Sequence, residues 1–190
     1  MPSPRLRAVI GAAAMVAAGF GAARPAGAET AAAFAFDSID GGSLPLSDWA
    51  GRPMLVVNTA SRCGFTPQYA GLQALHDTYS ARGLLVLAVP SDDFRQELAS
   101  EAEVAEFCEL NYDITLPMTT ITHVKGADAH PFYKWVERSS GFTPGWNFNK
   151  VLIGPGGAVS ATYGSLVKPR SGRITRRVEE MLQDAAAAGG

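Results

Sequence analysis

Residues 54–66 of the chain read Met-Leu-Val-Val-Asn-Thr-Ala-Ser-Arg-Cys-Gly-Phe-Thr. The run from Met54 to Ala60 is nearly all apolar and rich in β-branched side chains, which is typical of a strand buried on both faces. A short loop containing Cys63 follows. Thr66 and Pro67 then predict the start of a helix, with Thr66 as its N-cap and Pro67 as its first residue.

The next segments complete a strand–helix–strand unit. The predicted helix presents an apolar face at helical spacing and ends at Gly83; the face consists of Tyr69, Leu72, Leu75 and Tyr79. Leu84–Val89 predicts a second buried strand. Residues 54–89 therefore form one βαβ unit, in which the two strands run parallel.

The order of the remaining predicted strands and helices indicates the fold class. Phe34–Phe36 and Leu44–Leu46 flank a turn and predict a small hairpin. Ser100 and Glu103 form a capping box that opens a helix, with Val104, Phe107, Cys108 and Asn111 on one face. A short helix over His130–Arg138, strands over Asn149–Ile153 and Val159–Tyr163, and a last helix carrying Ile174, Val178, Met181 and Leu182 follow. This order predicts an α/β protein, a thioredoxin-like sandwich with a central mixed β-sheet flanked by helices.

The first 28 residues have the pattern of a secretory signal peptide. Arg5 and Arg7 precede an apolar run, Ala8–Ala23, and Ala26–Ala28 is an A-x-A cleavage site. The run is short and weakly hydrophobic for a membrane span, although an uncleaved anchor remains the alternative. We expect a signal peptide over 1–28, one thioredoxin-like domain over 29–190, and export. The Ala-rich composition of the segment suggests a bacterial periplasm as the destination.

Composition excludes several kinds of partner. The chain has 190 residues and a formal net charge of −2, without a basic stripe, so we expect no nucleic-acid partner. No second hydrophobic segment follows the first, so we expect no stable membrane association. The three histidines are scattered, and with two distant cysteines they do not give a metal-ligand spacing. We therefore expect neither a metal nor another cofactor.

Cys63 and Cys108 are the only cysteines. In an oxidising compartment, two cysteines most often form a static disulfide. Cys63, however, lies between a buried strand and a helix N-terminus, which together with Arg62 favours a thiolate, the nucleophilic form. Thr66 occupies the place of the second cysteine in a C-x-x-C motif. A single cysteine at this position points toward peroxide chemistry rather than disulfide exchange.

Three segments resemble glutathione peroxidases of the cysteine type. Asn58–Thr66 is similar to the active-site segment of that family, Phe94–Glu97 to a second segment and Trp146–Lys150 to a third. The resemblance extends from about Phe34 to Leu182. It implies a thioredoxin-like fold and the reduction of hydrogen peroxide and organic, including lipid, hydroperoxides.

The resemblance also implies which residues act. The catalytic tetrad of the family falls on Cys63, Gln96, Trp146 and Asn147, in which two side-chain amides and an indole N–H are available to hold a thiolate and the leaving oxygen. The loop Pro90–Leu98 is one residue shorter than the usual pattern, and Arg95 stands where the family commonly has glycine.

Cys108 lies in a segment that resembles the resolving-cysteine segment of thioredoxin-dependent members. The implied cycle forms a sulfenic acid on Cys63, then a Cys63–Cys108 disulfide, which a thioredoxin-like protein or glutathione reduces. A helix-borne Cys108 facing the core need not approach Cys63 closely enough for a disulfide, so we expect the helix to unwind partly during turnover. The short segment Asp128–Gly145 implies a monomer.

Two other functions remain open from the sequence. One is an exported thiol–disulfide oxidoreductase, and the other is a non-catalytic domain with a structural Cys63–Cys108 disulfide. The missing C-x-x-C disfavours the first, and rapid reaction of the reduced protein with peroxide separates the peroxidase from the second.

Overall fold

A central sheet of four strands organises the computed structural model, which describes residues 29–188. Its strands are β3 (Met54–Thr59), β4 (Leu85–Pro90), β5 (Lys150–Ile153) and β6 (Val159–Tyr163), in the spatial order β4-β3-β5-β6. β3 and β4 are parallel, whereas β5 is antiparallel to both β3 and β6. The proposed signal peptide lies outside the described residues.

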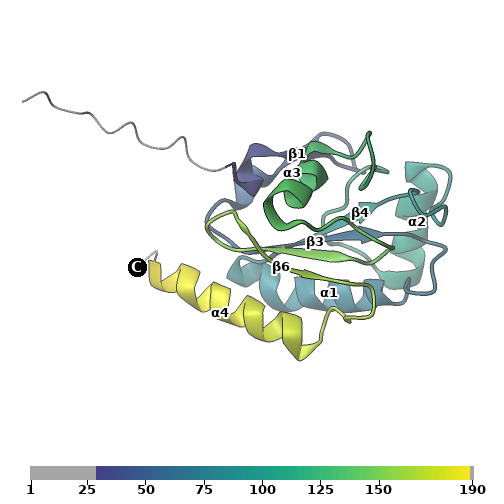
Figure 1. The fold of residues 1–190 in the computed structure, drawn as a ribbon. Coiled ribbons are helices and arrows are strands. Elements are labelled where there is room, and N and C mark those ends of the chain that lie inside the picture. Colours follow the sequence, from purple (N-terminus) through teal and green to yellow (C-terminus); the bar gives the residue numbers. More distant parts are fainter. Residues whose placement is uncertain (1–28, 189–190) are drawn as a thin grey trace, which may run out of the picture.

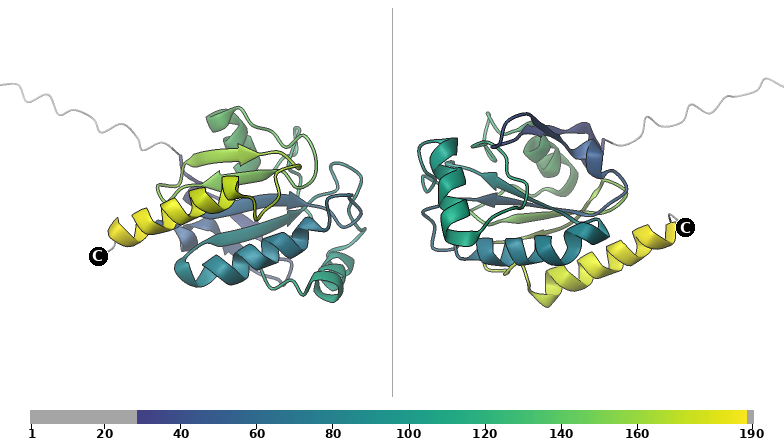
Figure 2. Two further views of the ribbon diagram at one scale, coloured as in Figure 1. Left: turned by 90° about the horizontal axis from the view of Figure 1, so that it is seen from below. Right: turned by 180° about the vertical axis from the view of Figure 1, so that it is seen from behind.

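Helices cover both faces of this sheet (Figure 1). They are α1 (Gln68–Tyr79), α2 (Glu101–Tyr112), α3 (Pro131–Ser140) and α4 (Gly172–Ala188), with short 3₁₀ turns η1 (Ala31–Ala33), η2 (Leu46–Trp49) and η3 (Ser80–Arg82). α1 and α4 lie on one side, while α3 lies on the other beside the hairpin of β1 (Ala35–Asp37) and β2 (Ser43–Pro45) (Figures 1 and 2). None of the described helices is long and apolar enough to span a membrane.

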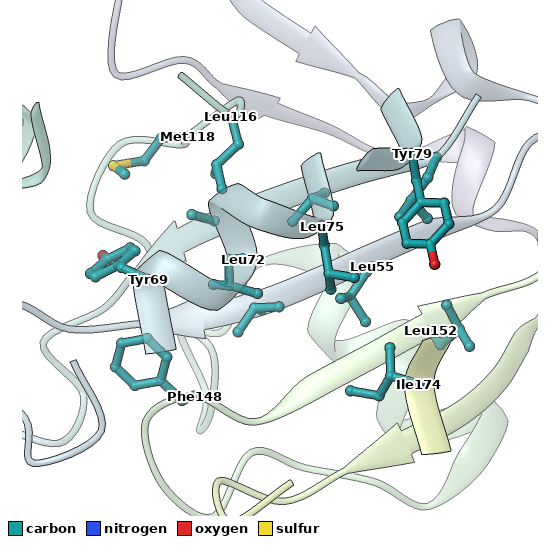
Figure 3. Close-up of a cluster of buried hydrophobic side chains, with 14 of the residues drawn as sticks. Leu55, Tyr69, Leu72, Leu75, Tyr79, Leu116, Met118, Phe148, Leu152 and Ile174 are labelled. Carbon is teal, nitrogen blue, oxygen red and sulfur yellow. The ribbon is translucent and has the colours of Figure 1, made fainter. Parts of the chain in front are cut away.

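Strand alternation divides the core into two clusters. Leu55 and Val57 of β3 face α1, α2 and α4, and Met54 and Val56 face α3 and the hairpin. Figure 3 shows the first cluster, in which Leu72 and its helical neighbours pack over the strands. Because every residue of β3 and β4 is buried, the two strands read as continuous apolar runs rather than alternating ones.

The predicted central mixed sheet flanked by helices is confirmed, with local corrections. The second strand begins at Leu85, and α2 extends to Tyr112. Asn111 is exposed rather than on the buried face of α2. The predicted cap of α1 is wrong, because α1 begins at Gln68 and no side chain caps its N-terminus. The Thr66 hydroxyl instead turns back into the preceding loop.

β5 begins with a buried lysine that ties the sheet to α1. Lys150 Nζ donates to Gln68 Oε1 at 2.8 Å and to the Phe148 carbonyl at 2.7 Å. The residue is fully buried and faces no carboxylate among its hydrogen-bond partners. Burial accordingly lowers the pKa of the Lys150 ammonium to about 8.

The buried ammonium makes stability depend on alkaline pH. Above about pH 8, the folded state has released the Lys150 proton while the unfolded state keeps it until the ordinary lysine pKa near 10.4. Raising the pH from 8 to 10 therefore favours folding. We expect the free energy of unfolding, measured by urea denaturation, to rise over this range by on the order of 2 kcal/mol more in wild type than in Lys150→Met. Parallel pH profiles of the two proteins would contradict the assignment.

Candidate active site

The loop that follows β3 is held by the Thr66 hydroxyl. Thr66 Oγ1 donates to the Ala60 carbonyl at 2.9 Å or the Cys63 carbonyl at 2.6 Å, and accepts from the Cys63 backbone N–H at 3.0 Å. One buried hydroxyl thus closes the turn that presents Cys63. This use of its oxygen explains why Thr66 is not an N-cap for α1.

Cys63 is buried at the carboxyl end of β3, with 7% of its surface exposed. Its sulfur accepts a hydrogen bond from the Phe65 backbone N–H at 3.4 Å. Arg62 is exposed and takes part in none of the salt bridges found among residues 29–188. The backbone N–H of Phe65, in the turn before α1, is thus the donor that faces the sulfur.

The loop carrying Gln96 lies directly against the Cys63 loop. The Arg62 backbone N–H donates to the Gln96 carbonyl at 2.8 Å. Arg95 has a φ of 58°, the left-handed region in which side chains other than glycine are strained. This conformation explains why glycine is common at this position in the family that the sequence resembles. Arg95 keeps the same backbone conformation at a cost in conformational energy.

Asn147 and Gln96 are joined through their side chains. Asn147 Nδ2 donates to Gln96 Oε1 at 3.0 Å, and Asn147 Oδ1 is buried without a hydrogen-bond partner. Trp146 is 41% exposed and packs against Phe94, with ring centroids 5.4 Å apart. The structure therefore brings the segments of all four predicted residues to the same end of the sheet, with the Trp146 ring at the surface.

Asn58 holds the Trp146 segment and was not singled out as a site residue from the sequence. Its Nδ2 donates to the Trp146 carbonyl at 3.0 Å, and its Oδ1 accepts from the Asn149 N–H at 3.1 Å. Its backbone carbonyl accepts from the Phe148 N–H at 2.6 Å. The signal for Asn58 in the sequence is that it is a polar residue within an otherwise apolar strand.

Asn149 and Ser165 extend this support. Asn149 Nδ2 donates to Ser165 Oγ at 2.8 Å, and that hydroxyl donates to the Asn147 carbonyl at 2.6 Å. Gln68 Nε2 of α1 donates to the Ser165 carbonyl at 2.7 Å. Buried polar networks fix a unique geometry when their members are satisfied, and this one fixes the backbone on either side of Asn147.

A buried carboxylate, that of Glu97, stands next to the site. Glu97 Oε1 accepts from the backbone N–H groups of Ser61 and Leu98, both at 2.9 Å. Burial raises the pKa of the Glu97 carboxyl, against the lowering effect of these hydrogen bonds. Glu97 therefore fastens the two loops together and leaves its Oε2 without a partner.

Cys108 is buried on α2 and belongs to the same core cluster as Cys63. Both cysteines are free thiols, so the structure does not contain the static disulfide of the alternative reading. Burial raises the pKa of the Cys108 thiol to about 11, and the charge of Glu97 adds to this. The Tyr69 hydroxyl lies near the Cys108 sulfur without a hydrogen bond of good geometry.

Within residues 29–188, no three His, Cys, Asp or Glu side chains come together as a metal site would require.

Comparison with known proteins gives consistent results. A sequence profile described as "Glutathione peroxidase" matches residues 32–137. The "Hydroperoxy fatty acid reductase gpx1" of Synechocystis sp. is 39% identical over 163 residues, which cover 78% of this chain and 94% of that protein. The "Glutathione peroxidase-like peroxiredoxin gpx1" of Schizosaccharomyces pombe is 42% identical over 148 residues, covering 75% and 92% respectively.

Solved structures agree with the fold. The crystal structure of Trgpx in apo form superposes with a TM-score of 0.66 and 29% identity, over 82% of this chain and 97% of that one. A thiol:disulfide interchange protein of the thioredoxin family from Chlorobium tepidum gives a TM-score of 0.58 at 17% identity, which reflects the fold alone. The predicted thioredoxin-like fold is confirmed. With the family profile and the relatives covering most of its length, the chain belongs to the glutathione peroxidase family and is a peroxidase.

Proposed function

We propose that Cys63 is the peroxide-reducing residue of this thiol peroxidase, with Gln96, Trp146 and Asn147 as its hydrogen-bond donors. The observation that carries this assignment is the linked pair of contacts from Arg62 to the Gln96 carbonyl and from Asn147 to the Gln96 side chain. These contacts join the three loops on which the four residues lie.

The arrangement suits attack on an O–O bond. The Cys63 thiolate attacks the terminal peroxide oxygen, the O–O bond breaks, and the sulfur becomes a sulfenic acid while an alkoxide or hydroxide leaves. Neutral amide and indole donors stabilise the thiolate and the departing oxygen without neutralising either by proton transfer in the resting state. A proton from solvent completes the alcohol or water.

Organic hydroperoxides have a place to bind beside this loop. A cavity of about 440 Å³ is lined by apolar and basic side chains, among them Phe65, Leu166, Lys168 and Arg170. Leu166, which is 84% exposed, contributes an apolar side chain to this lining. We infer that bulky hydroperoxides, including lipid ones, are substrates along with hydrogen peroxide.

The second step is resolution by Cys108. Its thiol attacks the sulfenic acid of Cys63, giving a disulfide and water. Cys108 is buried among core side chains on α2, so the helix must release it. A thioredoxin-like dithiol protein then reduces the disulfide, with glutathione as the alternative reductant. Thiol–disulfide oxidoreductase activity of the chain itself is disfavoured, because Cys63-Gly64-Phe65-Thr66 has no second cysteine.

Export and oligomeric state complete the proposal. The charged, apolar and A-x-A segments of residues 1–28 support secretion to a bacterial periplasm with cleavage after Ala28. The short Asp128–Gly145 segment supports a monomer. Cell fractionation with N-terminal sequencing tests the first, and size-exclusion chromatography with light scattering tests the second; a cytoplasmic full-length chain or a stable tetramer would contradict them.

Stopped-flow Trp fluorescence tests the role of Cys63. We expect the fully reduced protein to show a fast change on mixing with hydrogen peroxide, because oxidation at Cys63 alters the surroundings of Trp146. Cys63→Ser abolishes this change, whereas Cys108→Ser keeps it. If the reduced protein reacted with hydrogen peroxide no faster than a free thiol does, the catalytic role of Cys63 would be contradicted and the alternative of a non-catalytic domain would remain.

Asn147 provides a test of the donor set. Replacing one preorganised donor costs about 10²–10³ in rate in comparable sites, so we expect Asn147→Ala to slow Cys63 oxidation by about that factor. Asn111→Ala, which alters an exposed asparagine on α2, serves as the matched control and retains the wild-type rate. Equal rates for the two variants would contradict a donor role.

Resolution requires α2 to change shape, which is measurable. We expect the disulfide form to lose amide-exchange protection over α2, since Cys108 leaves the core, while α1 and α4 stay protected. The Cys108→Ser protein accumulates a sulfenic acid that dimedone traps, and its α2 stays protected after peroxide. Unchanged protection of α2 in a protein with a proven Cys63–Cys108 disulfide would contradict unwinding.

A further inference from the structure

The indole ring of Trp146 depends on a neighbour for its direction. Asn58 Nδ2 donates to the Trp146 carbonyl at 3.0 Å and so holds the backbone. The ring itself is 41% exposed and packs on Phe94, with ring centroids 5.4 Å apart and planes inclined at 52°. A side chain exposed to this degree has room for more than one rotamer. The direction of the indole N–H therefore depends on how firmly Phe94 is held.

A lysine from another segment lies over the same phenyl ring. Lys125 Nζ is 4.1 Å from the centroid of the Phe94 ring. A cation within about 6 Å of the centroid is attracted to the negative face of an aromatic ring. Phe94 thus contacts the Lys125 ammonium and the Trp146 indole at once, and it connects a charged side chain to a proposed donor of the site.

The carboxylate of Asp93 ties the Phe94 loop to the segment that carries Lys125. Its Oδ1 lies 2.7 Å from His123 Nδ1, and its Oδ2 accepts from the backbone N–H groups of Val124 at 2.6 Å and Lys125 at 3.1 Å. Partial burial raises the pKa of the Asp93 carboxyl, but these hydrogen bonds outweigh that effect and the pKa is lowered. An ionised carboxylate therefore holds the backbone of Lys125 beside Phe94.

The segment over residues 123–125 is itself anchored in the fold. Val124 is fully buried in the core cluster that faces α3 and the hairpin. The carbonyl of His123 accepts from the N–H of His130, the N-cap of α3, at 2.9 Å. The support of Phe94 thus comes from α3 and the core, and it is separate from the hydrogen bonds that hold the Trp146 backbone.

We propose that Lys125 is a positioning residue for the reduction of peroxide: its ammonium holds the Phe94 ring, and Phe94 holds the Trp146 indole in the direction that the reaction requires. The inference rests on the donor role proposed above for Trp146. Direction matters because a small misplacement of a group that binds the reacting atoms slows a reaction strongly. Lys125 acts through the two rings, and its role requires no contact with the peroxide.

Substitution of Lys125 tests the inference. Lys125→Met keeps an unbranched side chain and the backbone N–H that donates to Asp93, but removes the charge. A cation on an aromatic ring at a partly exposed site is worth a factor of about two to five in an equilibrium constant. We therefore expect hydrogen peroxide to oxidise Cys63 about two- to fivefold more slowly in Lys125→Met than in wild type. The rate is measured as loss of the Cys63 thiol, by rapid quenching with an alkylating reagent, so it does not depend on Trp fluorescence.

Two further variants serve as controls. Lys125→Arg keeps a cation for the Phe94 ring, and we expect it to retain a rate close to that of wild type. Lys134→Met removes a partly exposed lysine from α3, and this matched variant also retains the wild-type rate.

A double variant shows whether Lys125 acts through Trp146. Trp146→Phe removes the indole N–H and leaves an aromatic ring beside Phe94. Substitutions at residues that act along one path are not additive. We therefore expect Lys125→Met to cause no further slowing in the Trp146→Phe protein.

Nuclear magnetic resonance reports on the Trp146 ring directly. Its indole N–H signal is identified by its absence from the Trp146→Phe protein. We expect Lys125→Met to shift or broaden this signal and Lys125→Arg to preserve it. Unchanged indole signals of Trp49 and Trp135 verify that each variant is folded.

Three results would overturn the inference: the wild-type rate in Lys125→Met, an equal loss of rate in Lys125→Arg, or the same loss in the Trp146→Phe background. The last result would mean that Lys125 acts independently of the indole. If Trp146→Phe itself reacted at the wild-type rate, the donor role of Trp146 would be refuted, and the inference with it. Absence of a fast reaction at Cys63 in wild type would instead refute the proposed function.

Discussion

The site depends on one buried asparagine at the end of the central strand. Asn58 uses its side-chain amide and its backbone carbonyl to hold the carbonyl of Trp146 and the N–H groups of Phe148 and Asn149. The pairing of β3 with β5 thereby continues past the regular ladder into the segment that carries Asn147. An aliphatic residue in the same place would leave the Trp146 carbonyl and the Asn149 N–H without these partners, at a cost of about 1–3 kcal/mol each where they are buried.

The backbone itself is strained at both loops that meet the Cys63 loop. Arg95 and Phe148 each adopt a φ near 60°, a region that costs side chains other than glycine on the order of 1 kcal/mol. The strain occurs next to Gln96 and Asn147, the pair whose side chains bond to each other. Strong surrounding contacts, among them the Lys150 and Asn58 hydrogen bonds, maintain a conformation that the local sequence alone disfavours.

Much of this structure follows from pattern. The buried runs of β3 and β4, the capping box of α2 and the apolar faces of α1 and α4 each depend on local periodicity, and the structure has them within a residue or two. Asn58, Glu97 and Lys150 could not be assigned in this way, because each depends on a partner between 36 and 91 residues away in the chain. The cap of α1 is wrongly predicted for a different, local reason: the Thr66 oxygen accepts from the Cys63 N–H, three residues earlier, and from no N–H of the helix end.

Cys108 is a core residue that the proposed cycle also uses as a reactant. Any reaction at its sulfur has to withdraw a packed side chain from between α2 and the sheet. The contacts that stabilise the core are therefore the same contacts that have to break during turnover. Tightening α2 against α1 would make the protein harder to melt and slower to cycle, and loosening it would do the reverse. If Cys108 resolves the sulfenic acid as proposed, the reaction itself limits the thermal stability of this enzyme, and a heat-adapted relative would have to gain its stability elsewhere, along α3 and the N-terminal hairpin.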